Sequence, residues 1–104
     1  MRRGQIWTLL RGSSQHRILV ISNDEYNSVD VLPIWALTVV RDVPHPNHLA
    51  VRLDEGDPLT GAYVRIHSVV QVADRSALRD NHGFVSHATM EAVETALREF
   101  LELP

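Results

Sequence analysis

The sequence contains one segment with a clear helical period, and that segment lies at the C-terminal end. Its apolar residues recur at intervals of three and four and fall on one helical face: Met90, Val93, Leu97, Phe100 and Leu101. Glutamates and Arg98 occupy the other positions, and either Ser86 or Thr89 can cap the start. The earlier apolar runs are short and rich in β-branched residues. A chain of this pattern is expected to form a sheet first and to lay one terminal helix across it.

The expected strands are separated by turns and polar loops. They span residues 5–10, 17–22, 31–40, 48–53 and 62–73. The first two flank a loop from Arg11 to Gln15 and predict a hairpin, while Pro33 favours an edge position or a bulge near the start of the third. Asp74 can cap a short turn through Leu78. The fold class is therefore predicted as mainly β (α+β), a small antiparallel curled sheet or SH3-like barrel with a C-terminal amphipathic helix.

Length and composition predict a single globular domain spanning residues 1–104. No apolar run approaches the roughly 20 residues that a membrane helix requires, and the short run after Gly4 does not resemble a signal peptide. We therefore expect a cytoplasmic protein without a membrane segment. The chain has no cysteine, which excludes disulfides and thiolate catalysis.

Charge is unevenly distributed along the chain. The net charge of −3 argues against a generally basic nucleic-acid coat. Residues 1–22 nevertheless contain Arg2, Arg3, Arg11 and Arg17 without any acidic residue. A local basic face on an acidic protein is therefore expected.

Three short motifs resemble the MazF/PemK (Kid) toxin family. They are Arg3-Gly4-Gln5-Ile6-Trp7, the run Arg17 to Asp24 (RILVISND), and Val72 to Leu78 (VADRSAL) ahead of the closing helix. The resemblance covers nearly the whole chain. The sequence departs from the family pattern at Gln5, at Ile18, in the shortness of the loop from Arg11 to Gln15, and in the strand before Val72.

The resemblance implies a homodimer with a CcdB/MazF-like fold. It implies a sequence-selective endoribonuclease that cuts single-stranded RNA without a metal ion or other cofactor, held inactive by a cognate MazE-like antitoxin. It also implies that Arg17, at the beginning of the second strand, projects into the RNA site, and that Thr38 lies near a family Thr or Ser that helps to hold the scissile phosphate.

The residues themselves allow this chemistry. Metal-free RNA cleavage uses the ribose 2′-hydroxyl as nucleophile, so it requires a base, an acid and positive charge on the phosphorane. Arg17 can stabilise the phosphate or act as the acid, because a guanidinium offers a fork of donors. Thr38 is the one polar residue in the run from Val31 to Val40. Their ordinary alternatives are a surface salt bridge for Arg17 and a plain strand position for Thr38.

Arg65 and His67 are two further catalytic candidates. Alternation along a strand places both on one face, where an arginine and a titratable base can meet the same phosphate. They resemble a family branch with Arg-x-Asp at this place, with His67 in place of the aspartate. The alternative is the polar outer face of a half-exposed strand.

Four other residues are candidate RNA contacts. His16 can join Arg17 at the phosphate or be merely solvated, and Trp35 can stack on a base or serve as a core or dimer contact. Arg11 and Arg41 begin the two loops, Arg11–Gln15 and Arg41–Asn47, that are expected to form the rims of the RNA site.

No metal site is predicted. His45 and His48 are three residues apart, but prolines surround them and no nearby cysteine or pair of acids completes a ligand set. Two alternatives to catalysis remain: a catalytically degenerate or CcdB-like binding protein of the same fold, including a gyrase poison, and a plain dimeric interaction module. The chain ends Phe100-Leu101-Glu102-Leu103-Pro104 and lacks the Trp-Gly-Ile tail of CcdB, which disfavours the gyrase alternative.

Overall fold

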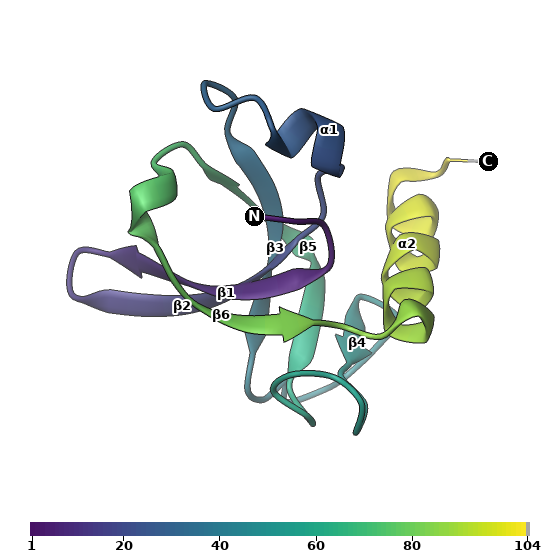
Figure 1. Ribbon diagram of the computed structural model, residues 1–104. Helices are drawn as coiled ribbons and strands as arrows, with labels where there is room; N and C mark the ends of the chain where they lie inside the picture. The colour runs from purple at the N-terminus through teal and green to yellow at the C-terminus, as the bar shows by residue number, and fades with distance from the viewer. Residues whose placement is uncertain (104) are drawn as a thin grey trace.

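A six-stranded antiparallel sheet with the strand order β4-β5-β3-β2-β1-β6 forms the body of the protein (Figure 1). The computed structural model describes residues 1–103, so Pro104, the last residue of the predicted domain and tail, lies outside the described residues. The strands are β1 (Gln5–Arg11), β2 (Ser14–Val20), β3 (Ile34–Val40), β4 (Ala50–Arg52), β5 (Tyr63–Val72) and β6 (Leu78–Phe84). The helices are α1 (Asp24–Asn27), the 3₁₀ helix η1 (Arg75–Ala77) and α2 (His87–Leu101). The sheet is strongly curled and α2 lies along one side of it, which confirms the predicted fold class.

The hairpin of β1 and β2 is tighter than predicted. The two strands pair as far as Arg11 and Ser14, so only Gly12 and Ser13 separate them. Gly12 has a φ of 60°, which a glycine adopts without strain at the first central position of a two-residue turn. The predicted loop from Arg11 to Gln15 was therefore wrong, because most of its residues belong to the strands.

Strand β3 is an interior strand between β5 and β2. It begins at Ile34, directly after Pro33, where the missing N–H of proline costs no ladder hydrogen bond. The expected start at residue 31 and the edge position were wrong. The predicted strands at 48–53 and 62–73 are present as β4 and as one continuous β5.

Two elements were missed by the sequence patterns. β6 carries mostly polar residues, with Asp80 at a φ of 50°, yet it pairs with β1. α1 is a single turn whose N-cap, Asn23, accepts a hydrogen bond from the backbone N–H of Tyr26 at 2.7 Å. The predicted cap at Asp74 is confirmed, since its side chain accepts from the N–H of Ser76.

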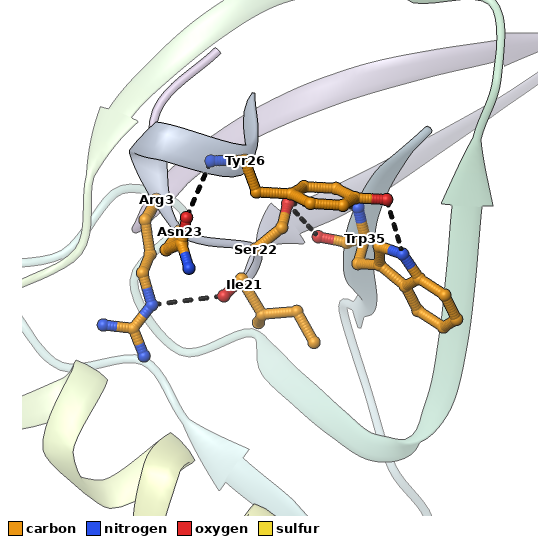
Figure 2. A pocket seen from close by; sticks show the side chains of 6 residues that line it. All are labelled: Arg3, Ile21, Ser22, Asn23, Tyr26 and Trp35. Atoms are coloured by element: carbon orange, nitrogen blue, oxygen red, sulfur yellow. Dashed lines mark hydrogen bonds between the residues drawn. The ribbon is translucent and has the colours of Figure 1, made fainter. Parts of the chain in front are cut away.

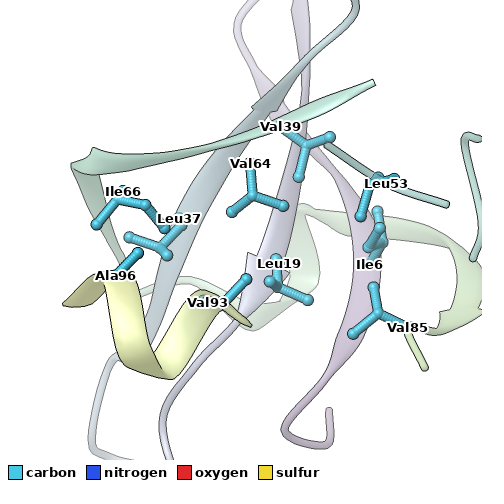
Figure 3. Packing of buried hydrophobic residues seen from close by; sticks show 10 residues of the cluster. All are labelled: Ile6, Leu19, Leu37, Val39, Leu53, Val64, Ile66, Val85, Val93 and Ala96. Atoms are coloured by element: carbon cyan, nitrogen blue, oxygen red, sulfur yellow. The ribbon is translucent and has the colours of Figure 1, made fainter. Parts of the chain in front are cut away.

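The sheet has a core on each face. The helix-side core lies between the sheet and α2 and consists of Ile6, Leu19, Leu37, Val39, Leu53, Val64, Ile66, Val85, Val93 and Ala96 (Figure 3). The far-side core consists of Leu9, Ile18, Val20, Ile34, Ala36, Val72 and Leu78. Alternate residues of β2 and β3 thus enter different cores, which fixes the face on which each side chain of these strands lies.

Helix α2 starts where the sequence indicated, but it buries fewer of its apolar side chains than expected. Ser86 is the N-cap and accepts from the N–H of Thr89 at 3.1 Å, which leaves Thr89 inside the helix. Phe100 and Leu101 were expected on the buried face, but they are 45% and 56% exposed. The correction arises because Ala96 and Leu97 are the last helix residues to pack against the helix-side core. No helix within residues 1–103 is long and apolar enough to cross a membrane.

Candidate functional site

A groove of about 720 Å³ opens where β2 and β3 meet the loop that precedes β5. Its lining consists of Gln15, His16, Arg17, Thr38, Val39, Val40, Arg41, Leu59, Thr60, Gly61 and Ala62. Four of the predicted site residues are therefore brought together: Arg17, Thr38, His16 and Arg41. The lining contains two arginines and a histidine but no carboxylate, so an anion meets attraction there without repulsion from the walls.

The strand register decides which of these side chains share a face. Arg17 pairs with Val39, which belongs to the helix-side core, whereas Thr38 pairs with Ile18 of the far-side core. Directly paired residues project to the same side of a sheet, so Arg17 and Thr38 project to opposite faces although both line the groove. His16, two residues before Ile18, lies on the same face as Thr38. His16 is therefore the titratable residue of β2 that shares the face of Thr38.

The cationic groups of the groove are free of intramolecular partners. Within residues 1–103, the side chains of His16, Arg17 and Arg41 make no hydrogen bond or ion pair. Arg17 is half-buried, while His16 and Arg41 are exposed. Their donors are available to a ligand, because satisfying them would cost no existing interaction.

Arg65 and His67 lie on β5 outside the groove lining. Val64 and Ile66 enter the helix-side core, so alternation places Arg65 and His67 on the opposite face, which is the face of Thr38. Nη2 of Arg65 lies 3.0 Å from Nε2 of His67. A guanidinium can only donate, so the ring nitrogen of His67 is the acceptor in this contact. Arg65 and His67 therefore share one face, as expected, but Arg17 lies on the other face.

Arg11 and Trp35 lie away from the groove. Arg11 is exposed at the end of β1. Trp35 lines a second, shallower pocket of about 540 Å³ that shares no residue with the groove (Figure 2). There its Nε1 donates to the hydroxyl of Tyr26 at 3.1 Å, and Nε of Arg3 donates to the carbonyl of Ile21 at 3.1 Å.

The N-terminal part of the predicted basic face is neutralised by acidic partners. Arg3 forms an ion pair with Glu94 of α2, with 2.5 Å between Nη2 and Oε1. Arg2 lies 3.4 Å from the carboxylate of Asp24. These two ion pairs connect the N-terminus to the body of the protein. The positive charge at Arg17 and Arg41 is not neutralised in this way.

Asp57 supports one wall of the groove and was missed by the sequence patterns. Its side chain is 6% exposed and accepts hydrogen bonds from the N–H groups of Asp54 (2.8 Å) and Ser86 (2.6 Å) and from the hydroxyl of Thr89 (2.6 Å). Burial raises the pKa of Asp57, but these hydrogen bonds outweigh it and hold the pKa below its usual value. The carboxylate thus ties the loop that carries Leu59 to the start of α2. The sequence indicated only a turn here.

Potential metal ligands are not gathered in the part of the chain that the structure describes. Across residues 1–103, no three histidine, aspartate or glutamate side chains come close enough together to hold a metal ion. The chemistry that the groove can supply therefore comes from guanidinium, imidazole and hydroxyl groups.

Comparison with known proteins gives consistent relatives. The family model of the PemK-like, MazF-like toxin of type II toxin-antitoxin systems matches residues 2–101. The chain is 33% identical to endoribonuclease MazF4 of Mycobacterium tuberculosis and to endoribonuclease MazF1 of Mycobacterium bovis. Each match covers 98% of this chain and 93% of the relative.

Solved structures agree with this similarity. A mycobacterial endoribonuclease in complex with its cognate antitoxin is 29% identical, with a TM-score of 0.89 over 100% of this chain and 97% of that one. A MazE-MazF structure from Deinococcus radiodurans has a TM-score of 0.83 over 100% and 97% of the two chains, and at 19% identity it supports the fold alone. The chain belongs to the PemK-like, MazF-like toxins of type II toxin-antitoxin systems.

Proposed function

We propose that this toxin, an endoribonuclease like its relatives, cleaves single-stranded RNA in the groove between β2, β3 and the loop before β5. The observation that carries the proposal is the lining of that groove. Arg17, Arg41 and His16 line it without side-chain partners among residues 1–103, Thr38 adds a hydroxyl, and the lining contains no carboxylate, although the chain carries a net charge of −3. Such a groove fits a phosphodiester backbone.

The reaction proceeds without a metal ion. The ribose 2′-oxygen attacks phosphorus after losing its proton to a base, the bond from phosphorus to the 5′-oxygen breaks, and an acid protonates that oxygen. The products are a 2′,3′-cyclic phosphate and a 5′-hydroxyl. His16 is positioned to exchange protons beside Thr38, while the guanidinium of Arg17 donates to the phosphorane oxygens and stabilises their charge.

The remaining predicted residues extend the RNA path. Arg41 holds a phosphate next to the scissile one, and Arg65 with His67 contacts RNA along the face of Thr38. Arg11 and Trp35 lie outside the groove, so they contact RNA only where the strand runs beyond it. Trp35 can still stack on a base, since its ring is partly exposed.

Protein partners belong to the same proposal. One of the similar solved structures is an endoribonuclease bound to its cognate antitoxin, and we propose an antitoxin of this kind for this chain, docking over the cationic groove with acidic residues. We also propose a homodimer. A second copy would cover exposed apolar side chains such as Phe100 and Leu101, which the chain itself leaves unpacked. The toxin freed from its antitoxin would act in the cytoplasm, where its RNA substrate is.

The proposal is tested by incubating the purified, antitoxin-free protein with a long single-stranded RNA in EDTA and mapping the ends. We expect discrete cuts with 5′-hydroxyl ends. Arg17→Ala and His16→Ala should each lower the rate about 100-fold, as expected for removal of a group that stabilises or protonates the transition state.

Arg98→Ala provides the matched control, because Arg98 is an exposed arginine on α2 outside the groove lining. It should cleave at the rate of the unmodified protein. Equal rates for all four proteins would overturn the assignment of the groove. Absence of cleavage by a well-folded dimer would favour the binding-only alternative instead.

A further inference from the structure

Two hydroxyl groups are hydrogen-bonded to each other at the edge of the groove. The hydroxyl of Ser68, on β5, donates to Oγ1 of Thr38 at 2.9 Å. Thr38 lines the groove, whereas Ser68 is half-buried behind it and is absent from the lining. The pair therefore connects a groove residue to a residue outside the groove lining.

The strand register of β3 and β5 brings these two hydroxyls together. Leu37 pairs with Val69 and Val39 pairs with Val64, so the single residue Thr38 faces residues 65–68 of β5. Continuing the register of Ala36 with Val70 and Leu37 with Val69 by one residue places Ser68 opposite Thr38. The register shifts only beyond this point, before Val39, and such irregularities are frequent beside active sites.

The hydrogen bonds of Thr38 leave its own proton nearly free. A threonine hydroxyl has one proton to donate and two lone pairs that accept. Ser68 fills one lone pair at 2.9 Å, but the donation from Thr38 to the carbonyl oxygen of Ser68 spans 3.5 Å, beyond the usual range for an O–H donor. A phosphate oxygen in the groove can therefore take this proton at little cost.

We infer that Ser68 is a positioning residue for RNA cleavage, which acts by orienting and polarising the hydroxyl of Thr38 toward the scissile phosphate. When Thr38 donates to a phosphate oxygen, Ser68, Thr38 and the phosphate form a continuous hydrogen-bonded chain. Each bond in such a chain strengthens the next. The gain is largest when negative charge builds on the phosphorane, so the effect belongs to the chemical step. This inference rests on the proposed cleavage in the groove.

The test is a double-mutant cycle on RNA cleavage with Ser68→Ala and Thr38→Val, measuring kcat and KM separately. Ser68→Ala should lower kcat about 10-fold and leave KM within about 2-fold, as expected for one hydrogen bond realised in the transition state. Thr38→Val should lower kcat further, and Ser68→Ala should then have no additional effect. Ser68→Thr, which keeps the hydroxyl, should restore at least half of the original kcat.

The outcomes separate this inference from the proposed function. If Thr38→Val cleaves normally, the role of Thr38 in the groove fails, and the role of Ser68 fails with it. If Thr38→Val is impaired while Ser68→Ala is normal, or if the two effects multiply, the proposed function stands and the inference about Ser68 is overturned. A lower melting temperature of Ser68→Ala with unchanged kcat would make the hydroxyl pair purely structural, which also overturns it.

Discussion

The groove and the loop that follows α1 each involve an arginine, but one arginine side chain has hydrogen-bond partners and the other, within residues 1–103, has none. Arg75 has a side chain only 19% exposed, and it donates to the backbone carbonyls of Asn27 (2.5 Å), Val29 (2.8 Å) and Leu32 (3.1 Å). The side chain of Arg17 in the groove makes no hydrogen bond within residues 1–103. The first guanidinium closes a loop. The second remains available for a ligand. The two arginines thus differ in whether their guanidinium donors already have hydrogen-bond partners.

A similar contrast separates the two walls of the groove. The wall that carries Leu59 is held by Asp57, whose carboxylate accepts three hydrogen bonds. The opposite wall carries His16, Arg17 and Arg41, whose side chains line the groove and have no partner within residues 1–103. One wall is thus fixed by satisfied polar groups, and the other presents unsatisfied ones. The predictions below test whether the first set contributes stability and the second set function.

The largest effect on stability is expected at Arg75. Arg75→Ala leaves three carbonyl groups without their donor, so the free energy of unfolding should fall by about 3 kcal/mol. Arg75→Lys should recover less than half of this, because an ammonium cannot span three carbonyls as a planar guanidinium does. Urea denaturation measures both values. A loss below about 0.5 kcal/mol for the alanine variant would break the contrast with Arg17.

A smaller loss is expected at Asp57. In Asp57→Asn, an amide N–H₂ faces a group that donates a hydrogen bond to the carboxylate in the unmodified protein. The free energy of unfolding at pH 7 should therefore fall by about 2 kcal/mol. The loss should also depend on pH. The folded state holds the pKa of Asp57 below the value of about 3.9 in the unfolded chain, so this stability is fully present above about pH 5 and disappears as the pH falls through the folded pKa.

Denaturation curves at a series of pH values check this sign. The difference between the unmodified protein and Asp57→Asn should shrink steadily from pH 5 to pH 2. A difference that stays constant over that range would show that the charge of Asp57 contributes nothing to folding.

The smallest effect is expected at His67, which belongs to neither the polar groups that contribute stability nor those that line the groove. Its Nε2 already accepts from Arg65, and it lies outside the groove lining. His67→Ala should lower the cleavage rate about 3-fold, change the pH dependence of that rate, and leave the free energy of unfolding within about 0.5 kcal/mol. Identical pH profiles of the variant and the unmodified protein would remove His67 from the mechanism.

The sequence predicted the fold class because its periodic signals were strong. The alternation from His48 to Leu53 and the three- and four-residue spacing around Val93 each admit one secondary structure. β6 was not predicted because its residues from Arg79 to Gly83 are polar or typical of turns. Only pairing with β1 makes them a strand. Tertiary context overrode local propensity there.

The candidate site was predicted only in part, because its geometry depends on register. The residue types of Arg17 and Thr38 indicated phosphate chemistry, but a strand shifted by one residue exchanges its two faces. Only the pairing shows that His16, rather than Arg17, shares the face of Thr38. The contact between Thr38 and Ser68 depends on the register of β3 against β5, which no spacing in the sequence reveals.

The most direct test of the central claim compares Arg17→Ala with Arg75→Ala, two identical substitutions in opposite settings. The measurement is the RNA cleavage rate per folded molecule in EDTA, with the folded fraction taken from denaturation curves of the same preparations. We predict a loss of about 100-fold for Arg17→Ala with unchanged stability, and a rate within about 3-fold of the original for Arg75→Ala despite its lower stability. Equal rates per folded molecule in the two variants would contradict the account.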